Sequence, residues 1–153
     1  MAGSGKAHLR PEDETLIRVE DLVVEYSIPG GDTVKAVSGI SFDIKPGETL
    51  GLVGESGCGK STTGKALIQL PKPSSGSVKH NLVELTDLSS EAMRRRRTDL
   101  QMIFQDPISS LNPLRKVEDI VAEPMKIWGP RDKSKQKEMV DNILESVGID
   151  PEQ

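Results

Sequence analysis

The residues best suited to chemistry form one glycine-rich stretch, Gly54-Glu55-Ser56-Gly57-Cys58-Gly59-Lys60-Ser61-Thr62. This stretch matches the pattern G-x-x-x-x-G-K-[S/T], which is typical of loops that bind the phosphate groups of a nucleotide. Such a loop needs a buried strand before it and a helix after it. The apolar residues 50–53 and the run 60–69 are predicted to supply these two elements. The sequence therefore predicts a nucleotide-binding site.

Each residue type in the loop has a physical part in holding phosphate. Because Gly54, Gly57 and Gly59 have no Cβ, the backbone can curve until several N–H groups point at the phosphate oxygens. A helix that begins near Gly59 presents unpaired amides and the positive end of its dipole to the anion. Lys60 is expected to neutralise the outer phosphates, and the Ser61 hydroxyl is expected to bind the Mg²⁺ that bridges them.

Composition limits the classes of protein that fit. A length of 153 residues favours one domain, and a net charge of −4 gives no sign of a nucleic-acid-binding surface. The arginines 94–97 are predicted to be a solvated helix surface, with a phosphate or RNA contact as the alternative. Cys58 is the only cysteine, which excludes an intrachain disulfide. No stretch approaches the roughly 20 apolar residues of a membrane span, and the polar residues 1–15 are expected to form a flexible tail.

The pattern of apolar residues places the loop behind an antiparallel sheet. Residues 17–26 alternate apolar and charged side chains, as a half-buried strand does, and residues 34–44 are predicted to form its partner with a bulge at Gly39. The remaining predicted elements are a strand pair over 77–85, a helix over 89–97 that Ser89 caps, a buried strand over 100–104, and helices over 117–125 and 136–147.

In this order the motifs resemble the nucleotide-binding subunits of ATP-binding-cassette (ABC) transporters, most closely the oligopeptide, dipeptide and nickel importer branch. The likeness covers about residues 16–153. It rests on Tyr26, the run KAVSGISFDIKPGETLGLVGESGCGKSTTGKAL, the turn Pro73-Ser74-Ser75-Gly76 and the run MIFQDPISSLNP. The phosphate loop alone would fit many ATPases and GTPases. The run MIFQDPISSLNP is what narrows the resemblance to the importer branch.

The resemblance implies roles for residues outside the loop. Tyr26 matches the aromatic residue that stacks on the adenine ring, with a core tyrosine as the alternative. Gln105 matches the glutamine that reaches Mg²⁺ and the attacking water, so it is expected to be catalytic together with Lys60. The segment 106–128 resembles the surface that receives a coupling helix of the membrane subunit. Trp128 fits either that surface or a core.

The resemblance also implies a fold and a biological setting. The fold is α/β, a P-loop NTPase core of ABC type with an N-terminal antiparallel β subdomain and a helical subdomain that begins at about residue 113. The cofactors are ATP and Mg²⁺. The partners are transmembrane permease subunits and a second ATP-binding subunit, without nucleic acid, and the location is peripheral, on the cytoplasmic face of the cell membrane.

Several family elements have no counterpart in the sequence. The LSGGQ-type element, the Walker B strand and the switch histidine follow these motifs in the family, and neither His8 nor His80 replaces the last of them. We therefore expect residues 16–153 to be the N-terminal part of an ATPase subunit, incomplete at the C-terminus, that binds ATP without competent turnover.

Two other functions compete with an energy-coupling ATPase subunit of a peptide importer. One is a non-enzymatic nucleotide-binding fragment or interaction module that docks through residues 106–128. The other is a GTPase or small-molecule kinase, which shares the loop chemistry. The latter is disfavoured because the sequence has no N-K-x-D motif for reading a guanine base.

Overall fold

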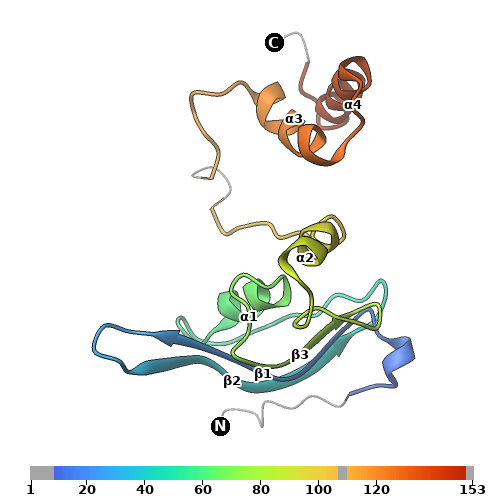
Figure 1. The fold of residues 1–153 in the computed structure, drawn as a ribbon. Helices are drawn as coiled ribbons and strands as arrows, with labels where there is room; N and C mark the ends of the chain where they lie inside the picture. Colours follow the sequence, from blue (N-terminus) through green and yellow to red (C-terminus); the bar gives the residue numbers. More distant parts are fainter. Residues whose placement is uncertain (1–8, 107–109, 151–153) are drawn as a thin grey trace. The chain divides into compact units, whose positions relative to one another are not determined.

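The computed structural model describes residues 9–106 and 110–150 (Figure 1). The chain divides into two compact units, Met1–Met102 and Ile103–Gln153, and each unit is described by itself. The first unit contains the sheet and the predicted phosphate loop. The second contains a pair of helices.

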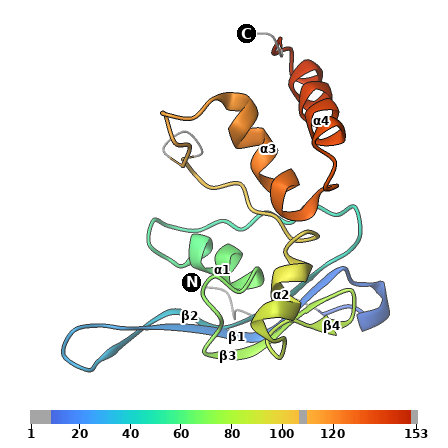
Figure 2. The same ribbon diagram turned by 45° about the horizontal axis from the view of Figure 1, so that its top comes forward.

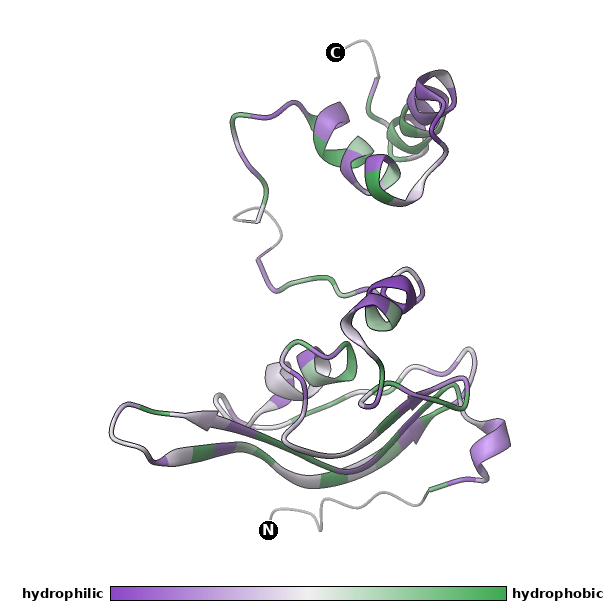
Figure 3. Cartoon of the chain, in the orientation of Figure 1, coloured by the Kyte–Doolittle hydropathy of each residue, from purple (hydrophilic) through white to green (hydrophobic). Residues whose placement is uncertain are grey.

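The sheet of the first unit has four antiparallel strands in the order β2-β1-β3-β4. These are β1 Ile17–Ser27, β2 Thr33–Ile44, β3 Ser75–His80 and β4 Val83–Glu84. Along β1 the buried side chains alternate with more exposed ones, because successive residues of a strand point to opposite faces. Figure 3 shows this alternation as changes of colour along the strands. The strands predicted over 17–26, 34–44 and 77–85 are thereby confirmed.

The predicted bulge at Gly39 is also confirmed. Leu22 pairs with Ile40 whereas Val23 pairs with Ser38, so Gly39 is the extra residue of β2. Its φ of +79° is a left-handed conformation that glycine adopts without strain. A bulge increases the local twist of a strand.

Two helices, α1 Lys60–Leu67 and α2 Ser90–Arg96, lie over the same face of the sheet (Figures 1 and 2). Ala66 of α1 and Met93 of α2 are buried in a core with side chains of β1, β2 and β3. The Ser89 hydroxyl accepts a hydrogen bond from the Ala92 amide, which confirms the predicted cap of α2. Arg94, Arg95 and Arg97 are exposed and Arg96 is partly exposed, in agreement with a solvated helix surface.

Two predicted strands are absent from the described residues. Residues 50–53 and 100–104 have no strand geometry, and Val53 and Ile103 are 94% and 92% exposed. Figure 3 shows the second segment as a hydrophobic stretch that follows α2. A strand needs a hydrogen-bonded neighbour, and none of the four described strands pairs with either segment. Apolar composition was therefore not sufficient to make a strand here.

The prediction of a flexible tail is wrong for residues 10–15. A 3-10 helix, η1, spans Glu12–Glu14, and Thr15 is buried. The Arg10 amide donates to Asp43 (2.6 Å), and the Arg10 guanidinium makes two hydrogen bonds to Glu48 (2.6 and 2.8 Å). We call Arg10, Asp43 and Glu48 the N-terminal clasp. Residues 1–8 of the expected tail, including His8, lie outside the described residues.

The second unit contains α3 Val117–Trp128 and α4 Lys133–Ser146. The Asp132 carboxylate caps α4 by accepting hydrogen bonds from the Ser134 and Lys135 amides. Both helices were predicted, although α4 begins three residues before the expected Gln136. Val140 and Leu144 are buried, while Trp128 is 45% exposed and so is not a core residue.

None of the helices in the described part of the chain has the length and apolar character that crossing a membrane requires.

Candidate functional site

The predicted phosphate loop leads directly into helix α1. Residues 54–58 are exposed, and Gly59 is the N-cap residue of α1 with φ +91° and no side-chain cap. The first amide that bonds back along the helix is that of Thr63, which donates to the Gly59 carbonyl (2.8 Å). The amides of the preceding helical turn have no intrahelical acceptor and are available to an anion.

Gly59 lies where a side chain has no room. A Cβ added to it would fall far inside van der Waals contact with the carbonyl oxygen of Ala36, a backbone atom of β2. The start of α1 therefore lies directly against β2. Because the contact is with backbone, a larger residue could be accommodated only if the loop or the strand moved.

Lys60 orders the loop with its own ammonium group. Its Nζ donates to the carbonyls of Gly54 (2.8 Å) and Glu55 (2.6 Å) and lies 3.6 Å from the Cys58 Sγ. The positive charge is thus held against the backbone of the loop. This geometry fits a phosphate group, since a loop of exposed amides and an ammonium offers hydrogen-bond donors and positive charge together.

Proteins bind small molecules and cofactors in pockets of about 300–1,000 Å³, and a hollow of ≈ 590 Å³ lies beside the loop. One wall is formed by residues 34–40 of β2, and the other by residues 52–58 and the first turn of α1. The lining residues are Val34, Lys35, Ala36, Val37, Ser38, Ile40, Leu52, Val53, Gly57, Cys58, Lys60 and Thr63. The hollow therefore combines a largely apolar wall with the loop that carries the Lys60 ammonium.

Of the other predicted site residues, Ser61, Thr62 and Tyr26 belong to the first unit and Gln105 belongs to the second. Ser61 and Thr62 lie in the first turn of α1, and Ser61 is exposed. Tyr26 is 42% exposed near the end of β1 and pairs with Val34, a residue of the hollow's wall. Gln105 belongs to the second unit, where its side chain is exposed, so the geometry of the first unit does not include it.

Sequence reasoning did not single out the β2 wall of the hollow. Val34, Ala36 and Val37 occupy ordinary strand positions. Ala36 and Val37 fall within the run that carries the family resemblance, but nothing in that run marks them as site residues. Their position beside the loop follows from the contact between Gly59 and Ala36. The close approach of two segments distant in sequence carries no local signal, so this wall could be found only in the fold.

Comparisons with known proteins agree with the motifs. The model of the ABC transporter family matches residues 37–153. The oligopeptide transport ATP-binding protein OppF of Bacillus subtilis is 44% identical over 141 residues, which are 91% of this chain and 46% of OppF. The oligopeptide transport ATP-binding protein AppF of the same organism is 40% identical over 145 residues, which are 90% of this chain and 44% of AppF. The chain thus spans less than half the length of these relatives.

Solved structures show the same fold. The dimeric ATP-binding cassette MJ0796, in a post-hydrolysis state with ADP and Pi, matches with a TM-score of 0.72 at 22% identity, covering 89% of this chain and 59% of that one. The observed sheet, loop and helices are therefore those of an ABC cassette, as the motifs predicted. Since the family model covers most of the sequence, the chain belongs to the ABC transporter family.

Proposed function

We propose that this chain binds ATP at residues 54–62 and is part of the subunit that couples ATP hydrolysis to the import of peptides or related small solutes. The observation that carries the proposal is the arrangement of Lys60. Its ammonium donates hydrogen bonds to the Gly54 and Glu55 carbonyls of the loop, at the start of α1 and among the residues that line a hollow of ≈ 590 Å³. The names of the relatives OppF and AppF support peptide as the transported class.

Different residues would bind different parts of the nucleotide. The amides of Gly54 to Gly59 and of the first turn of α1 would bind phosphate oxygens, with Lys60 neutralising their charge. The Ser61 hydroxyl and the Gln105 amide would bind Mg²⁺, which supplies charge stabilisation for phosphoryl transfer. Tyr26 would stack on the adenine ring.

The 153 residues provide the phosphate clamp but not every group that hydrolysis needs. Transfer to water also requires a positioned nucleophile and further charge stabilisation. We therefore expect these residues to bind ATP without turning it over. In the complete subunit, a second ATP-binding subunit and transmembrane permease subunits are the proposed partners, on the cytoplasmic face of the membrane.

The domain boundaries belong to the same proposal. Residues 16–153 would form the N-terminal part of an ABC ATP-binding domain, whose helical subdomain begins at about residue 113. The start of α3 at Val117 is consistent with that boundary.

A second candidate function is an interaction module, and the exposed apolar side chains around α3 favour it. None of the residues of α3 is buried, and Leu114, Val117 and Ile127 are 93%, 55% and 55% exposed. These residues fall in the segment 106–128 that was expected to receive a coupling helix. Residues 107–109 of that segment lie outside the described residues.

Calorimetry with Mg-ATP tests the nucleotide site. Replacing Lys60 with alanine removes a charge-assisted hydrogen-bond donor, so the dissociation constant should rise by about tenfold to a hundredfold. Lys65→Ala is the matched control, since Lys65 is an exposed lysine of the same helix. Unchanged ATP affinity in Lys60→Ala, with normal helix content by circular dichroism, would show that the site is placed wrongly.

A further inference from the structure

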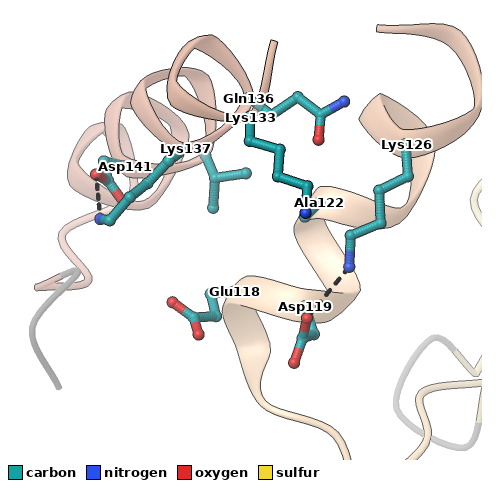
Figure 4. Close-up of a pocket in the computed structure, with 9 residues that line it drawn as sticks. Glu118, Asp119, Ala122, Lys126, Lys133, Gln136, Lys137 and Asp141 are labelled. Atoms are coloured by element: carbon teal, nitrogen blue, oxygen red, sulfur yellow. Dashed lines mark hydrogen bonds and ion pairs between the residues drawn. The ribbon is translucent and has the colours of Figure 1, made fainter. Parts of the chain in front are cut away.

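The second unit contains a groove that the nucleotide site does not use. It lies between α3 and α4 and has a volume of ≈ 400 Å³ (Figure 4). Volumes of about 300–1,000 Å³ are usual for pockets that bind small molecules. Its lining is drawn in Figure 4: Glu118, Asp119, Ala122 and Lys126 from α3, and Lys133, Gln136, Lys137, Val140 and Asp141 from α4.

The floor of the groove consists of small apolar side chains. Ala122 contributes only a methyl group from α3, and the buried Val140 lies opposite on α4. Gln136 holds the two helices together at one end, since its Nε2 donates to the carbonyls of Met125 (3.3 Å) and Pro130 (2.6 Å). A short apolar floor between two fixed helices therefore separates two charged walls.

The charges on these walls balance. Glu118, Asp119 and Asp141 are opposed by Lys126, Lys133 and Lys137. A ligand with charge of only one sign would therefore meet as much repulsion as attraction. A ligand that carries both signs can place each charge beside its opposite.

Two of the six charges have no ion-pair partner in the part of the chain that the structure describes. Lys126 bonds to Asp119 (3.2 Å) and Lys137 bonds to Asp141 (2.7 Å), as the dashed lines of Figure 4 show. Among the described residues, neither Glu118 nor Lys133 makes an ion pair. Glu118 lies in the first turn of α3, and Lys133 extends from the start of α4 (Figure 4). One free carboxylate and one free ammonium thus line the same groove.

We propose that this groove binds a small zwitterion, an amino acid or a short peptide, whose ammonium group pairs with Glu118 and whose carboxylate pairs with Lys133. The apolar floor of Ala122 and Val140 would contact the ligand's carbon chain. The groove shares no residue with the phosphate loop, which belongs to the first unit. The proposal therefore does not depend on nucleotide binding.

Titration of the ¹⁵N-labelled full chain with alanyl-alanine, followed by amide chemical shifts, tests the site. We expect saturable shifts confined to α3 and α4. Lys133→Gln and Glu118→Gln should each weaken binding by about threefold to fivefold, because each removes one solvent-exposed ion pair. The matched controls are Lys135→Gln and Glu138→Gln, which alter exposed residues of α4 outside the groove and should leave binding unchanged.

Blocked ligands and single-sign ligands identify the ligand class. N-acetyl-alanyl-alanine should be insensitive to Glu118→Gln, and alanyl-alanine amide should be insensitive to Lys133→Gln, because each lacks the charge that the residue would meet. Glutarate and cadaverine should bind more weakly than alanyl-alanine. The proposal is overturned if they bind as tightly, if no saturable shift occurs at millimolar dipeptide, or if the two groove variants bind the dipeptide as the controls do.

Discussion

Cys58 lies inside the phosphate loop at the point where Lys60 holds the loop together. Its Sγ is 3.6 Å from the Lys60 Nζ, and it packs so closely on Gly54 that a Cβ at that position would lie 2.6 Å from the sulfur. The thiol is nevertheless exposed. A reagent can therefore reach it, while an added group would have to displace neighbouring parts of the loop.

Alkylation of Cys58 with iodoacetamide should consequently abolish Mg-ATP binding, because the adduct occupies the space in which the loop and the ammonium must meet a phosphate. Mass spectrometry would establish complete labelling, and calorimetry would measure affinity. Cys58→Ser treated with the same reagent serves as the control and should bind ATP as before treatment. Full affinity in completely labelled wild-type chain would contradict the prediction.

Among the structural elements, the β3–β4 hairpin contains backbone strain at an exposed position. His80 pairs with Val83, so Asn81 and Leu82 form a two-residue turn, with φ of +47° and +64°. Turns of this kind favour Asn followed by Gly, because both residues need a left-handed conformation. Leu82 is 59% exposed and makes the turn with a branched side chain instead.

Replacing Leu82 with glycine should stabilise the first unit by about 0.5–1 kcal/mol, since relief of the left-handed strain exceeds the entropy that glycine loses on folding. Urea unfolding followed by circular dichroism would measure the change. Leu82→Ala is the control, because it removes the same exposed side chain but keeps the strain. If the glycine variant were no more stable than the alanine variant, the turn would not be strained.

Most of the elements could be predicted from local patterns. Alternating apolar residues indicated β1 and β2, and the Ser89 cap and the glycine–lysine motif indicated the starts of α2 and α1. The strands predicted over 50–53 and 100–104 were wrong. An apolar run indicates burial, but it does not indicate which strand, if any, pairs with it. The same limit applies to the site, because the loop matches a phosphate-binding pattern whereas nothing in the sequence marks the β2 wall as part of the site.

At the scale of the molecule, the N-terminal clasp connects parts of the chain that are far apart in sequence. Arg10 reaches Asp43 and Glu48, which are 33 and 38 residues away. The Arg10 guanidinium, and then the Lys45 amide, lower the pKa of Glu48 to about 2 from an ordinary value of 4.5. No local pattern predicts such a contact, which explains why residues 10–15 were expected to be flexible.

The clasp should make stability depend on pH in the acidic range. Because the pKa of Glu48 is lower in the folded chain, its contribution is fully present above pH 4.5 and is lost as the pH falls through about 2. The difference in unfolding free energy between wild type and Glu48→Gln should therefore shrink between these two pH values. Asp87→Asn, an exposed carboxylate of the same unit, is the control. A difference that stays constant down to pH 2 would argue against the clasp.

Gly59 and Lys60 adjoin in one motif but meet different requirements. Gly59 allows α1 to approach the Ala36 backbone, whereas Lys60 serves the ligand. Gly59 is needed for the chain to fold at all in this form, whether or not a nucleotide is ever present. Lys60 is needed for the ligand, and its hydrogen bonds reach carbonyls of the loop, so the close approach of Gly59 to β2 does not depend on this side chain. A related protein that no longer binds nucleotide could therefore lose the lysine, while its packing would still require the glycine. We expect Gly59 to persist longer than Lys60 in such proteins.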